Sequence, residues 1–179
     1  MRQALGEENF SRSFLRFDTG NLGNVARGFV SGSYTDADKW KGEGKSPNGR
    51  RNFAFGISGI PGQSVEWEFY GIRNYEKKHS YRGLKYNQVK NLSQYHDYDY
   101  NGALAGVPAT DAYYYDYNRQ DFRTYAYFGK VKVPVPFINQ ASLTFRPYYL
   151  KDEGYSYAGG VSGGSGYVTD WPVDHNCYG

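Results

Sequence analysis

The sequence has almost no cysteine and no long hydrophobic run. Cys177 is the single cysteine among 179 residues, so a disulfide within the chain is excluded. No apolar run approaches the roughly 20 residues that a membrane-spanning helix needs. The opening MRQALGEENF lacks the hydrophobic segment of a signal peptide. A disulfide-linked domain and a helical membrane protein are therefore not expected.

A block of like charges and a catalytic set are also missing. The 21 basic and 18 acidic residues are well mixed and leave a net charge of +3, so we expect no nucleic acid partner. His79, His96 and His175 lack the spacing of metal ligands, and Cys177 has no evident base beside it. The stretch GGVSGGSG follows no strand-to-helix pattern, so it is no phosphate loop. We expect neither an enzyme nor a cofactor.

Aromatic residues and glycine are abundant. Aromatics make up 19 % of the chain, 20 of them tyrosines, and there are 23 glycines. The hydrophobic fraction of 39 % and the mean hydropathy of −0.77 are low for a globular core. Aromatic side chains suit a pleated surface, and so many of them are atypical of a disordered chain. This composition favours a β protein.

The stretch NFAFGISGIPGQSVEWEFYG, residues 52–71, alternates in steps of two. Phe53, Phe55 and Ile57 fall on one face of an extended chain, and Asn52, Ala54 and Gly56 on the other. After IPGQS the pattern resumes, with Val65, Trp67 and Phe69 opposed to Glu66, Glu68 and Tyr70. Such alternation predicts two strands, each with two unlike faces.

Six segments have the character of strands, and their connectors differ in length. The strands are expected near residues 10–19, 24–35, 51–59, 65–75, 121–133 and 141–150. Short connectors (GNLG, IPGQS and PVPFINQ) contain turn residues, and long ones are expected near 36–50, 76–120 and 151–170. In an up-and-down meander, this alternation places all short turns at one rim and all long loops at the other.

Such a difference between rims is typical of bacterial outer-membrane barrels, which have short periplasmic turns and long extracellular loops. The sequence therefore predicts, over residues 1–179, an all-β antiparallel up-and-down meander of about six or seven strands, an open section of a large transmembrane barrel. The residues expected to face lipid are Phe53, Phe55, Ile57, Val65, Trp67, Phe69, Leu143 and Phe145. Charges such as Glu66 and Arg146 would line a wet lumen, although they would be as ordinary outside a soluble sheet.

Three blocks of the sequence resemble the first barrel strands of TonB-dependent outer-membrane receptors. The blocks are FLRFDTGNLGNVARGFVSGSYTDADKWKG, YNRQDFRTYAYFGKV and LTFRPYYLKDEGYSYAGG. The resemblance implies a barrel of about 22 strands plugged by an N-terminal domain. It also implies import of a scarce nutrient, most often a ferric siderophore, also cobalamin or a sugar. TonB acts on the plug, and no covalent chemistry is catalysed.

The chain departs from that family in several respects. It has no plug domain, no TonB-contacting motif and no terminal aromatic residue on a last strand. Because six or seven strands cannot close so wide a barrel, we expect a fragment of a receptor that resides in the bacterial outer membrane. Its expected partners are outer-membrane lipid, the imported ligand, and TonB through the missing plug.

The long segment near 76–120 holds the candidate ligand contacts. Its tyrosines offer rigid apolar faces with a hydroxyl, which suits them to grip a ligand. Those singled out are Tyr95, Tyr98, Tyr100, Tyr113, Tyr114 and Tyr115. Tyrosines near strand ends would instead form the aromatic girdle at the membrane surface.

Two alternatives concern this same segment. Asp97, Asp99 and Asn101 have the spacing that opens a calcium-binding EF-hand loop. Pro108 stands where that loop needs a bidentate Glu, so a solvated polar loop is favoured over a metal site. The alternative to the receptor is a secreted all-β binding module, lectin-like, that recognises carbohydrate through its tyrosine-rich loops.

Overall fold

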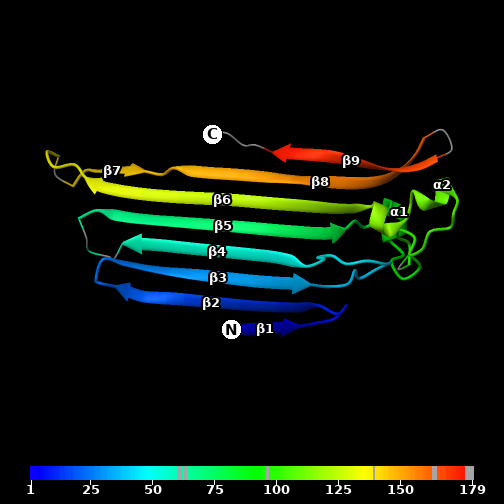
Figure 1. The fold of residues 1–179 in the computed structure, drawn as a ribbon, viewed down its shortest axis with the longest axis horizontal. Helices are drawn as coiled ribbons and strands as arrows, with labels where there is room; N and C mark the ends of the chain where they lie inside the picture. Colours follow the sequence, from blue (N-terminus) through cyan, green and yellow to red (C-terminus); the bar gives the residue numbers. More distant parts are fainter. Residues whose placement is uncertain (60–61, 63, 96, 139, 163–164, 176–179) are drawn as a thin grey trace.

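A computed structural model describes residues 1–59, 62, 64–95, 97–138, 140–162 and 165–175, and these form one antiparallel sheet in a single layer (Figure 1). The order across the sheet is β1-β2-β3-β4-β5-β6-β8-β9, with β7 also paired to β6. Because neighbours in the sheet are neighbours in the chain, the topology is an up-and-down meander. The predicted all-β antiparallel fold is confirmed.

The strands have the following bounds. They are β1 (Arg2–Leu5), β2 (Ser11–Leu22), β3 (Ala26–Asp36), β4 (Arg50–Gly59), β5 (Glu66–His79), β6 (Arg119–Pro134), β7 (Ser142–Phe145), β8 (Tyr148–Ser162) and β9 (Ser165–His175). Three single turns of helix, α1 (Tyr86–Val89), α2 (Pro108–Asp111) and the 3₁₀ turn η1 (Tyr115–Tyr117), lie between β5 and β6.

The long loop predicted near 151–170 is wrong. Strand β8 runs through residues 151–162 and β9 follows from Ser165, and the segment predicted at 141–150 divides into β7 and the start of β8. Glycine in this stretch serves close packing, because a Cβ at Gly154 would overlap the backbone oxygen of Asp121 on β6. The segment β1 was also not predicted.

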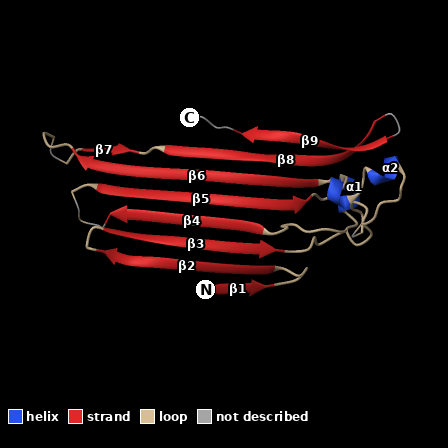
Figure 2. Cartoon of the chain, in the orientation of Figure 1, coloured by secondary structure: helices blue, strands red, loops and turns tan. Residues whose placement is uncertain are grey.

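The two ends of the sheet differ as expected for β2 to β7. The β2–β3, β4–β5 and β6–β7 turns lie at one end, and the long connectors at residues 37–49 and 80–118 lie at the other (Figure 2). Gly23 and Asn24 both have positive φ (56° and 53°), and the Val25 amide donates to the Leu22 carbonyl at 3.0 Å, as in a type I′ turn. The end with long connectors also carries the short β1–β2 connection, so the alternation is not strict throughout.

The sheet has no core of large side chains. In the described part of the chain, the buried apolar residues are five alanines, and no larger apolar residue is buried. The accessible surface is 12234 Å², whereas a compact monomer of 20.4 kDa would expose about 8,800 Å². The excess surface arises because no second layer covers either face of the sheet.

Strand register places the predicted apolar residues on one face, which we call the apolar face. Ile57 pairs with Phe69, Trp67 with Val131, and Val131 with Phe145. Leu143, Phe53 and Phe55 share this face by alternation, and Val65 lies just before β5. Large rings on it are open, with Phe53 50 % and Phe145 66 % exposed.

The opposite, polar face carries charges that pair across strands. Lys132 on β6 reaches Glu66 on β5 at 3.0 Å, and Lys130 reaches Glu68 at 3.6 Å. Alternation therefore assigned the glutamates to the correct face. Among the described residues, no helix has the length and apolar character to cross a membrane.

Glycines on the apolar face make room for rings from the next strand. The Phe55 ring lies over Gly71, where a Cβ would overlap it, whereas a Cβ at Gly32 would have only the Asn52 oxygen nearby, at 3.8 Å. A ring that covers a glycine in this way fills the gap left by the missing side chain. The two glycines thus occupy similar strand positions with very different surroundings.

We expect Gly71→Ala to lower the free energy of unfolding by about 1–3 kcal/mol, because the new methyl group displaces the Phe55 ring. Gly32→Ala, the matched control, should leave it unchanged or raise it slightly, since alanine restricts the unfolded chain more than glycine does. Urea unfolding of the full chain in detergent micelles, followed by tryptophan fluorescence, measures both. Equal shifts of the two midpoints would contradict this account of the face.

Candidate functional site

The two long connectors, residues 37–49 and 80–118, pack together at one end of the sheet, and we call them the loop cluster. Figure 2 shows them with α1 and α2 beyond the ends of β3 and β5. The cluster is tied to the strands and to itself by specific polar contacts. It is the part of the molecule in which the predicted ligand contacts lie.

A buried ion pair joins the two connectors. The Lys39 ammonium contacts the Asp99 carboxylate, and both side chains are 0 % exposed. Lys39 Nζ also donates to the Ser80 carbonyl at 2.9 Å, and the Arg82 amide donates to Asp99 Oδ1 at 2.6 Å. Buried charges must be paired and hydrogen bonded to be tolerated, so this pair holds residues 39, 80–82 and 99 in one arrangement.

A second lysine strengthens the same junction. Lys41 Nζ donates to the carbonyls of Arg82 at 3.0 Å and Tyr98 at 3.2 Å. Lys39 lies under the rings of Tyr81 and Tyr100, at 4.8 and 5.8 Å from their centroids. Burial raises the pKa of both tyrosine hydroxyls above the ordinary value, so they stay neutral at physiological pH.

His79 links the cluster to the end of β5. Its Nδ1 accepts the Lys45 amide proton at 2.8 Å, so Nε2 carries the proton of the neutral ring. Nε2 then lies 3.3 Å from Asp116 Oδ1, and Arg119 also contacts that carboxylate at 3.3 Å. The Tyr115 ring packs edge-on against His79, with centroids 5.0 Å apart.

The loop cluster also contacts β8. Asn118 donates from Nδ2 to the carbonyls of Ala112 and Tyr114, and its Oδ1 accepts the Gly159 amide proton at 3.3 Å. A Cβ on Gly159 would collide with the Ala112 carbonyl. Gly159 is therefore required for the close approach of α2 to the sheet.

The six tyrosines predicted to contact ligand divide into two groups. Tyr98 and Tyr113 lie beside Arg82, whose Cζ is 4.5 Å from each ring centroid, and Tyr100 is close enough for this cation to affect the pKa of its hydroxyl. Tyr95 packs on Tyr98. In the other group, the Tyr114 and Tyr115 rings pack against each other, and Tyr115 also packs against His79.

Arg82 was missed by sequence reasoning. It stands in SYRGLK, just after a strand, where nothing in the local pattern distinguishes it from other basic residues. Its partners lie 16 and 31 positions further along the chain, at Tyr98 and Tyr113. The one available signal was the density of tyrosines downstream, which indicates aromatic surface without indicating which cation would lie on it.

The structure does not form the calcium-binding loop that the spacing of Asp97, Asp99 and Asn101 suggested. The Asp99 carboxylate is occupied by Lys39 and the Arg82 amide, so it cannot also join a cage of oxygen ligands. The Asn101 side chain donates to the Thr110 carbonyl at 3.1 Å. Within the described residues, no group of three or more His, Cys, Asp or Glu is placed to hold a metal ion.

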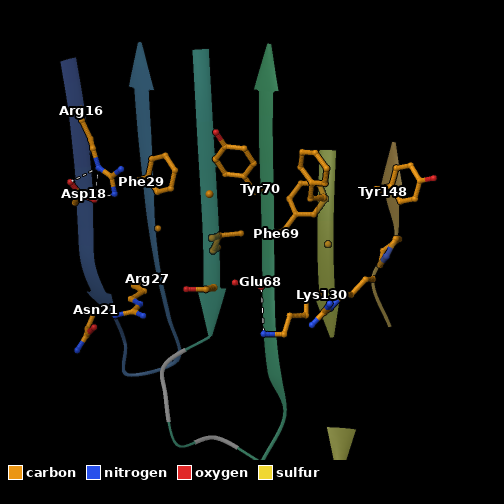
Figure 3. A pocket seen from close by; sticks show the side chains of 18 of the residues that line it. Arg16, Asp18, Asn21, Arg27, Phe29, Glu68, Phe69, Tyr70, Lys130 and Tyr148 are labelled. Atoms are coloured by element: carbon orange, nitrogen blue, oxygen red, sulfur yellow. Dashed lines mark hydrogen bonds and ion pairs between the residues drawn. The ribbon is translucent and has the colours of Figure 1, made fainter. Parts of the chain in front are cut away.

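A groove of 1040 Å³ lies on the polar face, away from the loop cluster (Figure 3). Rings of Phe29, Tyr70 and Phe128 follow one another across the strands, with centroids 6.2 and 6.3 Å apart. Arg16 stacks on Phe29 at 3.9 Å and pairs with Asp18 at 2.7 Å. This groove offers aromatic surface bordered by charge.

We expect Lys39→Met to destabilise the loop cluster by about 3–5 kcal/mol, because it leaves the Asp99 carboxylate buried without its counter-charge. The matched change Lys45→Met removes a cation that pairs with Asp36 but is 43 % exposed, and it should cost at most about 1 kcal/mol. Amide hydrogen exchange at residues 80–101 measures both. Similar loss of protection in the two variants would contradict the role given to Lys39.

We expect Gly159→Ala to displace α2 from β8, since the methyl group occupies the place of the Ala112 carbonyl. The cost should be about 1–3 kcal/mol, seen as faster amide exchange at residues 108–118. Gly83→Ala is the control, because a Cβ there has no heavy atom within 4 Å. Unchanged exchange in the Gly159 variant would contradict the close contact.

Three comparisons with known proteins place the chain in no family. No family model, no curated protein and no solved structure matches it. The resemblance of its sequence blocks to TonB-dependent receptors therefore remains an expectation, and the sheet and the loop cluster are the observations from which a function is inferred.

Proposed function

We propose that the chain forms part of the wall of an outer-membrane β-barrel, and that the barrel is a TonB-dependent receptor importing a ferric siderophore. In this proposal the apolar face contacts lipid and the polar face borders the lumen. The loop cluster lies on the extracellular side and contacts the ligand. Energy would come from TonB acting through a plug domain, as the resemblance implies.

The observation that carries the proposal is the exposure of the apolar face. Phe53, Phe69 and Phe145 are open on a single-layer sheet, although large rings gathered on one face normally mark contact with another apolar surface. In water such a sheet would also present unpaired strand edges and would aggregate. Lipid hydrocarbon would cover the apolar face without a second layer of protein. Further strands of a barrel would hydrogen bond to the unpaired backbone groups at the edges of the sheet.

The extent of the apolar band supports the same conclusion. On β6 it runs from Tyr125 to Val133, a stretch of about nine residues, and a tilted membrane-spanning strand needs about 9–11 residues. Charges replace it toward the loop cluster, where Arg51, Tyr75 and Arg123 follow one another across β4, β5 and β6. Tyrosines at this boundary, Tyr75 and Tyr125, are placed as an aromatic girdle would be.

The polar face is consistent with a wet lumen. Its ion pairs, such as Lys132 with Glu66, are exposed and would be expensive in hydrocarbon. The ordered polar contacts of the loop cluster suit a rigid extracellular surface, because preorganised side chains lose less conformational entropy on binding.

A fluorescence experiment on the full chain tests contact with lipid. A variant carrying Trp40→Phe and Trp171→Phe retains only Trp67, on the apolar face, and one carrying Trp67→Phe and Trp171→Phe retains only Trp40, in the loop cluster. In vesicles of brominated phosphatidylcholine we expect strong quenching of Trp67 and little of Trp40. A secreted binding module would leave both unquenched and would remain in the aqueous phase, which would refute the membrane proposal.

The Trp40-only variant also tests the cargo. Trp40 is stacked on Tyr81 within the cluster, with centroids 5.8 Å apart, so a bound ferric chelate that absorbs its emission should quench it saturably. Ferric hydroxamate and ferric catecholate siderophores are the probes, and their iron-free forms are the controls. Saturable quenching by a ferric form alone supports siderophore import; equal responses to both forms count against it.

A further inference from the structure

Arg82 is held in place through its own backbone. Its amide donates to the buried Asp99 carboxylate at 2.6 Å, and its carbonyl accepts from the buried Lys41 ammonium at 3.0 Å. Both partners are themselves fixed in the junction between the two connectors. Because both backbone groups of Arg82 are bound to buried charges, the start of its side chain has little freedom.

The Arg82 guanidinium lies against two tyrosine rings. Cζ lies 4.5 Å from the ring centroid of Tyr98 and 4.5 Å from that of Tyr113. Stacking uses the flat faces of a guanidinium, whereas its five N–H groups point outward in its plane. The contact with two rings therefore restricts the position of the cation.

No neighbouring carboxylate of the described residues accepts a hydrogen bond from the Arg82 guanidinium. Within the described part of the chain, the Arg82 guanidinium has no hydrogen bond or ion pair to a protein acceptor, in contrast to Arg16, Arg50 and Arg119. The carboxylates that might compete have other partners: Asp99 binds Lys39, and Asp111 accepts the Ala105 amide proton at 2.6 Å. Arg82 is half-buried and Tyr113 is 45 % exposed, so solvent reaches this corner of the cluster.

We propose that Arg82, set by Tyr98 and Tyr113, is a binding site for an oxyanion group of the ligand, either a carboxylate or a phosphate. A planar fork of donors matches two oxygens of such a group in a bidentate contact. This site deepens the proposed function, on which it rests for its ligand, by requiring an acidic cargo.

The direct test observes Arg82 itself. Side-chain Nε–Hε resonances of the ¹⁵N-labelled full chain, in non-ionic micelles, are followed during separate titrations with inorganic phosphate and with acetate. Sodium chloride at equal ionic strength is the reference. We expect the Arg82 resonance to shift saturably with one or both oxyanions, and the tighter of the two identifies the ligand group. Shifts no larger than those in chloride would overturn the proposal.

Variants test the geometry of the contact. Arg82→Gln should weaken oxyanion binding by about tenfold or more, because it removes the charge-assisted hydrogen bonds. Arg82→Lys should also weaken it several-fold, since an ammonium cannot make the bidentate contact. Lys90→Gln is the matched control: Lys90 lies 4.9 Å from the Tyr86 ring in the same cluster but contacts one ring only. Its loss should change the affinity less than twofold.

Protection from hydrogen exchange of the Asn101 and Tyr115 amides, which donate to the Tyr113 and Asn101 carbonyls at 2.7 and 3.0 Å, separates binding from folding in these variants. Loss of binding with protection unchanged supports the proposal, and full affinity in Arg82→Gln overturns it. If that variant loses protection, the titration of the unaltered chain decides instead. The quenching of Trp67 by brominated lipid does not depend on Arg82, so the membrane proposal and the oxyanion site can fail separately.

Discussion

Lateral backbone hydrogen bonding is the interaction on which this structure depends, because the sheet has no second layer to supply a core. Strands β2 to β6 and β8 are each paired with a neighbour on both sides, while the buried apolar side chains of the described residues are small alanines. A sheet of this kind gains little from burial within the chain itself. The function of the protein must therefore explain what covers its apolar face and what pairs with its strand edges.

Glycine and aromatic residues together make the single layer compact. On the polar face, the Phe29 ring lies over Gly56, where a Cβ would be 2.6 Å from it, and on the apolar face Phe55 lies over Gly71. Rings fold across strands into positions that side chains would otherwise fill, which gives contact between neighbouring strands without a facing layer. These contacts use the two residue types that are abundant in the composition.

The loop cluster is organised on the opposite principle, by buried charge. Two lysines of the connector at residues 37–49 pair with a carboxylate and with backbone carbonyls of the connector at residues 80–118. Neither connector can therefore adopt this arrangement alone. Pairing of this kind contributes little net stability after desolvation but specifies one geometry. The geometry fixes the backbone of Arg82 and thereby the direction in which its guanidinium can act.

Local periodicity was enough to predict much of the sheet. Alternation in steps of two identified β2 to β6 and assigned Phe53, Trp67 and Glu66 to their faces, because side-chain direction in a strand depends only on position along it. It failed at β8 and β9, where a long loop was predicted near 151–170 although Gly154 permits close pairing with β6.

The sequence by itself determined the class of fold and the two faces, since both follow from neighbouring residues. Only the tertiary structure decided the loop cluster. Asp99 has the local spacing of a calcium ligand, but Lys39, 60 positions earlier, occupies it. Arg82 likewise acquires its two rings through chain reversals that no local pattern encodes, because contact between distant residues depends on how strands and connectors are brought together.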